Sequence, residues 1–268
     1  MSFASLPMYN PAEDPGASAA LWRGIAHHLI RAGIADVPDR LLEGPPVPDH
    51  WLSDDLLFSQ TCGYPLTHAL KDRVQLLATP CYEAEGCEGS SYCSFVIVAA
   101  DSPATSLADL RGKRVAFNTP DSQSGMNALR ALVAPISGRK KFFAETIETG
   151  SHSASLAHVA AGKADMAAID CISFALFRGH GRADTKRVRI LCRTASAPNL
   201  PFITAGSTAP ERVQRLREGL RAAMADPALA GARQALLLKG IMLLPESAYQ
   251  PLLDMERDAE RQGYPRLA

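Results

Sequence analysis

Residues 112–133, GKRVAFNTPDSQSGMNALRALV, contain the pattern that decides the fold class. The segment KRVAF is typical of a buried strand, and the apolar residues after Gly125 recur with helical spacing. A polar turn, Asp121–Gly125, therefore lies between a strand and a helix. Two interpretations of this turn stay open. Either Asp121 or Ser122 caps the helix, or the exposed amides and hydroxyls at its start bind an anion.

Strands and helices alternate on both sides of this turn. Before it, the sequence predicts strands at 2–9, 73–80 and 94–100, a helix over 17–33 and an irregular loop over 43–51. Residues 54–66 are predicted as a short strand that runs into a polar turn at Thr61–Tyr64. After it come a helix ended by Pro135, strands at 143–151, 164–170, 187–195 and 200–206, and a helix over 154–162. The tail, 210–262, is predicted as helical, with breaks near Pro227 and Pro245. This order is typical of α/β sheets covered by helices on both faces.

Composition excludes several classes of protein. The 268 residues, 47% hydrophobic and 21% charged, suit a soluble globular chain of one large domain or two lobes. Because 28 Lys and Arg balance 28 Asp and Glu, no nucleic-acid partner is expected. No apolar run approaches the ~18 residues of a membrane span, so no membrane insertion is expected. Residues 1–14 have neither a basic nor an apolar region, and no signal peptide is predicted.

The six cysteines fit either reduced core thiols or up to three disulfides. Five residues separate Cys81 from Cys87 and Cys87 from Cys93, whereas paired zinc ligands have about two to four residues between them, so no metal site is expected. A disulfide between two of Cys62, Cys81 and Cys87 would fit an exported protein. The pairing among these and the remaining cysteines, Cys171 and Cys192 included, cannot be deduced from spacing.

Polar turns follow several of the predicted strands. They lie at Tyr9, Thr61–Tyr64, Asn118–Gly125, Gly150–Ser153 and Asp170. In open α/β sheets, ligands bind beyond the carboxyl ends of the strands, so these turns could share one cleft. The alternative is that they are ordinary connecting loops.

Five segments follow one another in a recognisable order: SLPMYN, DLLFSQTCGYPL, GCEGSSYCSFVIVAADSPATSLADLRGKRVAFNTPDSQSGMNALR, GSHSASLAHVAAGKADMAAID and LPFITA. Together they resemble the phosphate, phosphite and phosphonate substrate-binding proteins of ABC transporters, the PhnD-like group of type II periplasmic binding proteins. The resemblance covers almost the whole chain. It implies a two-lobe α/β fold in which each lobe is a mixed sheet flanked by helices and a ligand cleft lies between the lobes.

The resemblance also implies how the chain is divided. Lobe 1 would be discontinuous, with residues 1–94 and 205–268, and lobe 2 would hold residues 95–204. The crossover strands would be 94–100 and about 200–206, after which the C-terminal helices would return to lobe 1.

In this family a Ser/Thr-rich turn at a helix N-terminus holds an oxyanion. The matching residues here are Ser122, Gln123 and Ser124, with glutamine where a small hydroxyl residue is common. Because the Gln123 side chain is longer than that of a serine or threonine, it would narrow the binding site and so affect which oxyanion is preferred. Hydroxyls and free helix-start N–H groups can bind a phosphate-like group without a lysine, which suits reversible binding.

The family also uses a histidine, a carboxylate and tyrosines of lobe 1. His152 matches the histidine, Asp170 matches the carboxylate by position, and Tyr9 and Tyr64 are the candidate aromatics. Simpler interpretations stay open for each of them. His152 could cover the start of the next helix, Asp170 could cap the helix after it, and the tyrosines could be packing residues.

The resemblance implies a non-enzymatic, monomeric binding protein without a cofactor. It would be periplasmic and would deliver a small phosphate-like oxyanion to ABC permease subunits. Because no signal peptide is predicted, the alternative is a cytoplasmic anion sensor or sequestering protein of the same fold. An enzyme on this scaffold would need an acid–base pair, for which only His152 and Asp170 are present among the candidates.

Overall fold

The computed structural model describes residues 2–9, 14–44 and 48–268, which form two compact units. Unit 1 holds the residues up to Glu83, Glu88–Ser90 and Pro198–Ala248. Unit 2 holds Ala84–Cys87, Ser91–Ala197 and Tyr249–Ala268. Both units are therefore discontinuous in sequence, and each has its own sheet. The predicted α/β class is confirmed.

Unit 1 is built on a five-stranded mixed sheet in the order β1-β2-β12-β3-β13. β1 (Phe3–Ala4) runs parallel to β2 (Leu56–Gln60), whereas β12 (Phe202–Ala205) runs antiparallel to both β2 and β3 (Val74–Tyr82). β13 (Leu238–Met242) is antiparallel to β3. All residues of β2 and β12 are buried, as expected of central strands covered on both faces.

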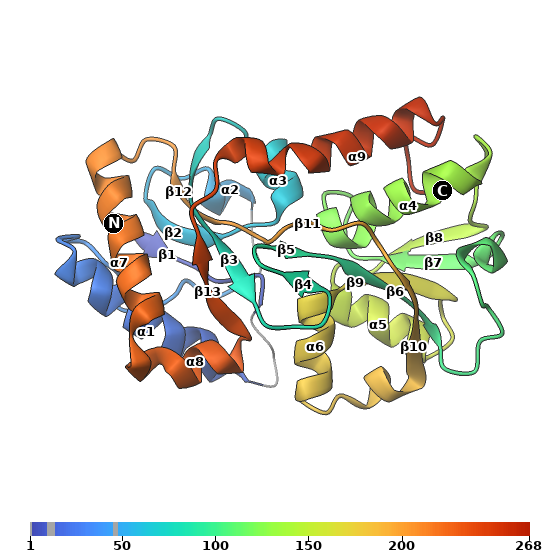
Figure 1. Ribbon diagram of the computed structural model, residues 1–268, viewed down its shortest axis with the longest axis horizontal. Helices are drawn as coiled ribbons and strands as arrows, with labels where there is room; N and C mark the ends of the chain where they lie inside the picture. Colours follow the sequence, from blue (N-terminus) through green and yellow to red (C-terminus); the bar gives the residue numbers. More distant parts are fainter. Residues whose placement is uncertain (1, 10–13, 45–47) are drawn as a thin grey trace. The chain divides into compact units, whose positions relative to one another are not determined.

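Two long helices of unit 1, α1 (Pro15–Arg31) and α7 (Pro210–Ala225), pack against each other (Figure 1). The helix predicted over 17–33 is confirmed as α1. It buries Leu21, Ile25 and Leu29, whereas Ile30 is 57% exposed. The shorter helices of the unit are α2 (Pro48–Trp51), α3 (Gly63–Thr67), α8 (Ala230–Ala235) and the 3-10 turn η4 (Pro227–Leu229).

The α2 turn corrects the expectation of an irregular loop over 43–51, of which residues 45–47 lie outside the described residues. Trp51 at its end is buried, and its indole N–H donates to Ser59 Oγ at 3.1 Å. This burial of a large aromatic side chain holds the short turn in a helical conformation although its sequence favours a loop.

Unit 2 is built on a second five-stranded mixed sheet in the order β10-β6-β9-β7-β8. β6 (Ser94–Ala99) is antiparallel to β10 (Val188–Arg193) and to β9 (Met166–Asp170). β7 (Arg114–Phe117) is parallel to β9 and to β8 (Glu145–Glu148). The carboxyl ends of β7, β8 and β9 therefore meet at one end of the sheet, where β6 begins.

Helices cover both faces of this sheet. α4 (Ala128–Ser137) and α9 (Gln250–Arg261) pack together on one face, and α5 (His152–Ala160) packs against β6, β7 and β9 on the other (Figure 1). α6 (Cys171–Gly179) follows β9 directly. The 3-10 turns η1 (Leu107–Leu110), η3 (Ala183–Arg187) and η5 (Glu246–Tyr249) lie in the connections.

The crossover strands are not where the resemblance implied. Runs 94–100 and 200–206 are β6 and β12, each of which pairs on both sides within one sheet. The chain passes between the units in the segments 83–92, 197–198 and 248–249. The first two contain the short strands β4 (Cys87–Glu88), β5 (Ser91–Tyr92) and β11 (Ala197–Pro198). An apolar run predicts a buried strand, but it cannot distinguish a central strand from a connecting one.

The C-terminal part of the chain also differs from the prediction. The tail contains β13, a strand that pairs with residues 79–82, and is not wholly helical. Residues 249–268, expected in lobe 1, belong to unit 2 because α9 packs on α4 and Arg130 pairs with Glu256. The helix that contains Pro135 also continues to Ser137, since proline removes only one N–H near its last turn.

Candidate functional site

The turn between β7 and α4 is one π-helical turn, η2 (Gln123–Asn127), that runs directly into α4. Ser122 caps it, because its Oγ accepts the N–H of Gly125 at 3.0 Å and its carbonyl accepts the N–H of Asn127 at 3.0 Å. π-helical turns are rare and occur frequently at functional sites. The capping interpretation is therefore correct for Ser122, and the turn has an unusual geometry that capping alone does not require.

Gly125 allows this turn to approach Asn118, which follows β7. A Cβ atom at position 125 would lie 2.0 Å from Asn118 Oδ1 and 3.3 Å from His152 Cε1, so only glycine fits without displacing a neighbour. Asn118 Oδ1 is buried and accepts no hydrogen bond from the described part of the chain. Asn118 Oδ1 is therefore a hydrogen-bond acceptor that lies next to the backbone of Gly125.

Ser124 and His152 are joined at this turn. Their Oγ and Nε2 atoms lie 2.7 Å apart. His152 is the first residue of α5, whose cap Ser151 accepts the N–H of Ala154 at 3.1 Å. Burial lowers the pKa of His152 to about 4, and the backbone carbonyl of Ala168 opposes this effect. The imidazole is therefore neutral near pH 7, and its contact with the Ser124 hydroxyl is a hydrogen bond between two uncharged groups.

Asp170 ends β9 and caps α6. One carboxylate oxygen, Oδ1, accepts the N–H groups of Ile172 at 2.7 Å and Ser173 at 2.9 Å. The side chain is almost fully buried, with 1% of its surface exposed. The capping interpretation of Asp170 is therefore correct, and it does not exclude a contact with a ligand.

Ser94 connects the turn to the end of β9. It is the β-sheet partner of Asp170, and its Oγ donates to the carbonyl of Ser124 at 3.0 Å. Sequence reasoning missed Ser94, although a hydroxyl residue that opens an otherwise apolar strand was a signal. The structure brings four of the predicted site residues to this end of the unit 2 sheet: Ser122, Ser124, His152 and Asp170.

Gln123 points in a different direction from the serines on either side of it. Its Oε1 accepts from Asn127 Nδ2 at 2.7 Å, and its Nε2 lies 3.3 Å from Met255 Sδ in α9. Asn127 Oδ1 in turn accepts from Arg130 at 2.6 Å, and Arg130 forms an ion pair with Glu256 at 3.0 Å. Gln123 thus links the π turn to the C-terminal helix.

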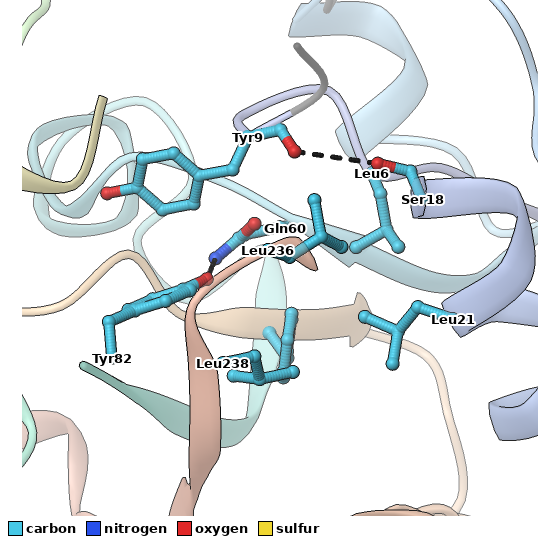
Figure 2. A pocket seen from close by; sticks show the side chains of 9 residues that line it. Leu6, Tyr9, Ser18, Leu21, Gln60, Tyr82, Leu236 and Leu238 are labelled. Carbon is cyan, nitrogen blue, oxygen red and sulfur yellow. Dashed lines mark hydrogen bonds between the residues drawn. The ribbon is translucent and has the colours of Figure 1, made fainter. Parts of the chain in front are cut away.

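The two predicted tyrosines lie in unit 1. Tyr9 packs edge to face on Tyr82, with ring centroids 5.0 Å apart, and both line a small cavity with Gln60 (Figure 2). Gln60 Nε2 donates to Tyr82 Oη at 2.9 Å. Tyr64 instead stacks on His68, with 3.8 Å between the ring centroids. Sequence reasoning missed Gln60 and Tyr82, although Gln60 is a polar residue at the end of an apolar strand.

The assembled groups of unit 2 suit an anion. They are serine hydroxyls, a neutral imidazole and the N-terminal ends of the helical segments that start at Gln123, His152 and Cys171. Helix starts carry partial positive charge and N–H groups that have no partner within the helix. A buried carboxylate, Asp170, stands beside them.

The chain matches the family described as ABC transporter, phosphonate, periplasmic substrate-binding protein over residues 54–249, which is more than half its length. No curated protein matches it.

Solved structures of similar fold cover nearly the whole chain. PhnD1 from Prochlorococcus marinus, in complex with methylphosphonate, is 14% identical with a TM-score of 0.74, over 97% of this chain and 98% of that one. A binding protein component of an ABC phosphonate transporter from Pseudomonas aeruginosa is 14% identical with a TM-score of 0.78, over 97% and 87%. XAC2383 from Xanthomonas citri, bound to ATP, is 18% identical with a TM-score of 0.72, over 97% and 98%.

These neighbours support the two-lobe periplasmic-binding-protein fold. Within the part of the chain that the structure describes, every helix is too short or too polar to cross a membrane. Because the family match covers most of the chain and the fold agrees, the chain belongs to the family of periplasmic phosphonate substrate-binding proteins of ABC transporters.

Proposed function

We propose that this chain is the substrate-binding component of an ABC importer and binds a phosphate-like oxyanion at the Ser122–Gly125 turn. The contact of 2.7 Å between Ser124 Oγ and His152 Nε2 carries the proposal, since it places two polar groups at a buried helix start. Oriented hydroxyl and N–H dipoles bind an anion strongly where little water competes.

The charges around the turn favour an oxyanion that carries a proton. Asp170 would repel a fully ionised anion but could accept a hydrogen bond from a P–OH group. Phosphate groups with a second pKa near ~6 retain such protons around neutral pH. Phosphate, phosphite and phosphonates are therefore the proposed ligands, and sulfate is disfavoured. An aminoalkylphosphonate could instead place its ammonium at Asp170.

Two structural neighbours support this ligand class, because one was solved with methylphosphonate and another with ATP, and both ligands contain phosphorus oxyanions. We further propose that Tyr9 and Tyr64 contribute to binding. The chain would act in the periplasm as a monomer, pass its ligand to permease subunits, and bind and release it without chemical change.

A panel of ligands tests this proposal. The purified protein would be heated with phosphate, phosphite, methylphosphonate, 2-aminoethylphosphonate or sulfate, and the midpoint of thermal unfolding recorded. At about a hundred times its dissociation constant, a ligand stabilises the folded state by about 2.7 kcal/mol, so a rise of several degrees is expected for at least one phosphorus oxyanion. No rise with any of them at millimolar concentration would contradict the proposal, as would sulfate giving the largest rise.

A further inference from the structure

Three thiols of unit 2 meet where the chain first enters this unit. Cys87 lies in β4, Cys93 lies just before β6, and Cys171 is the first residue of α6. The sulfur atoms of Cys87 and Cys171 are 3.6 Å apart. Regular spacing links Cys87 with Cys81 and Cys93 in the sequence, whereas 83 residues lie between Cys87 and Cys171.

The main chain holds these thiols together. The N–H of Cys171 donates to the carbonyl of Cys93 at 3.1 Å, and the N–H of Cys93 donates to the carbonyl of Gly86 at 3.1 Å. Three segments are thus fixed to one another by backbone hydrogen bonds. Their proximity does not depend only on side-chain rotamers.

Gly86 fits closely against the thiols. Its φ is +92°, and a Cβ at this position would lie 2.9 Å from Cys93 Sγ and 3.0 Å from Cys171 Cβ. Any other residue would be strained there and would displace the sulfur atoms. The connecting segment is therefore shaped around the thiols, which is not required of cysteines that only fill space.

The three thiols differ in access. Cys87 is half-buried, whereas Cys93 and Cys171 are buried. A hydrogen bond with Cys171, together with burial, raises the pKa of Cys93. The hydrogen bond with Cys87 raises the pKa of Cys171. An external reagent therefore reaches Cys87 first, and Cys171 is the thiol in contact with it.

We propose that Cys87 and Cys171 are a redox-active pair that closes to a disulfide when the protein meets a small-molecule disulfide such as oxidised glutathione. The deprotonated sulfur of Cys87 attacks one glutathione sulfur, breaks the S–S bond and releases one glutathione thiolate. The sulfur of Cys171, after losing its proton, attacks the Cys87 sulfur of this mixed disulfide and releases the second glutathione. The pair loses two electrons and two protons, and the glutathione disulfide is reduced to two thiols.

The disulfide would tie the segment that leads into unit 2 to the residue that follows Asp170. It closes a long loop, and such cross-links stabilise mainly by limiting the unfolded chain. The oxidised protein should therefore unfold at a temperature higher by roughly 5–10 °C than the reduced protein.

The test uses the full chain and needs no oxyanion. A negative result would therefore contradict the thiol pair without bearing on the proposed oxyanion binding. Reduced protein is incubated with oxidised glutathione near pH 8 and quenched with acid. It is then unfolded in guanidinium chloride near pH 7, so that N-ethylmaleimide reaches buried thiols, and the alkylated protein is analysed by intact mass and peptide mapping. We expect two of the six thiols to become unavailable to alkylation and one cross-linked peptide to contain Cys87 and Cys171. The unfolding temperature of this product should be raised.

Matched variants identify the pair. Cys93→Ser should keep the cross-link, and Cys87→Ser should abolish it while circular dichroism still shows a folded chain. Three results would each overturn the proposal. They are six alkylated thiols after incubation, stable glutathione adducts without a cross-link, and a cross-link through Cys93. The wild-type experiment decides by itself if a variant does not fold.

Discussion

Ser124 Oγ and His152 Nε2 are 2.7 Å apart although 28 positions separate the two residues in sequence. The contact joins the turn after β7 to the helix after β8, so it depends on the parallel pairing of these strands. Because burial keeps the imidazole neutral near pH 7, the contact is a hydrogen bond between neutral groups. This relationship determines both the chemistry of the turn and its response to pH.

His152 should make stability depend on pH. Its pKa is about 6.5 in an unfolded chain and about 4 in the folded one, so between these values the unfolded state binds the extra proton. The free energy of unfolding should therefore be fully retained above pH 6.5 and fall by at most about 3 kcal/mol as the pH is lowered to 4. Urea unfolding at steps of pH should show a flatter dependence in His152→Gln. His158→Gln, on the same helix, is the control, and equal slopes in both variants would contradict the assignment.

Gly125→Ala should disturb the turn. The new methyl group would lie 2.0 Å from Asn118 Oδ1, so the amide must move, at a cost of about 1–3 kcal/mol in stability. Binding of the oxyanion should weaken with it. Adding Asn118→Ala removes the clash and should restore most of the stability.

A glycine in open space provides the control for this variant. Gly231→Ala lies in helix α8, where no described residue apart from the adjacent helix turns comes within 4 Å of the added group, so this variant should be neutral or stabilising. If chemical denaturation gives Gly125→Ala the same free energy of unfolding as Gly231→Ala, the turn does not pack closely against Asn118.

Asp170→Asn should relax the selectivity of the site. The amide oxygen can still accept the N–H groups of Ile172 and Ser173, so the cap of α6 is kept while the charge is removed. The ratio of phosphate (or phosphonate) affinity to sulfate affinity should fall by roughly tenfold, because Asn can donate to sulfate and no longer repels it. Calorimetry at one pH and ionic strength measures this ratio.

Asp165→Asn, which changes a carboxylate at the opposite end of β9, should leave the ratio unchanged. If Asp170→Asn leaves the affinity ratio unchanged, as Asp165→Asn should, Asp170 acts only as a helix cap.

The C-terminal helix should contribute to the stability of unit 2. Arg130 is 4% exposed, and its ion pair with Glu256 reaches across from α4 to α9. Glu256→Ala leaves this guanidinium without its carboxylate and should destabilise the protein by about 3 kcal/mol. Asp258→Ala breaks an exposed pair with Arg261 on the same helix and should cost no more than about 1 kcal/mol. If urea unfolding shows that Glu256→Ala and Asp258→Ala lower the free energy of unfolding equally, the role given to Arg130 is contradicted.

The sequence predicted those features that depend on local pattern. The strand–turn–helix around Ser122 and the strand end at Asp170 follow from apolar periodicity and from the capping preferences of these residues. The sequence left open whether these turns meet in one cleft or are separate connecting loops. The parallel pairing of β7 with β9 brings these two turns to one end of the sheet.

Features set by long-range pairing could not be predicted in this way. The positions of β6 and β12 in the interior of two sheets depend on partners that periodicity does not reveal. The direction of Gln123 depends on α9, and the contact between Cys87 and Cys171 depends on how β9 and the connecting segment pack. In each case the local sequence allows several partners, and the tertiary fold selects one.

The most direct test of the central claim is the affinity of Ser124→Ala for the oxyanion that binds the wild-type protein best, measured by isothermal titration calorimetry. Ser207→Ala, an exposed serine of unit 1 bonded to Asp54, is the matched control. Removal of the Ser124 hydroxyl from a buried anion site should cost about 1.5–3 kcal/mol, or roughly a ten- to hundredfold loss of affinity, while the control binds as the wild type does. Equal affinities for wild type, Ser124→Ala and Ser207→Ala would contradict the assignment of the oxyanion to the Ser122–Gly125 turn.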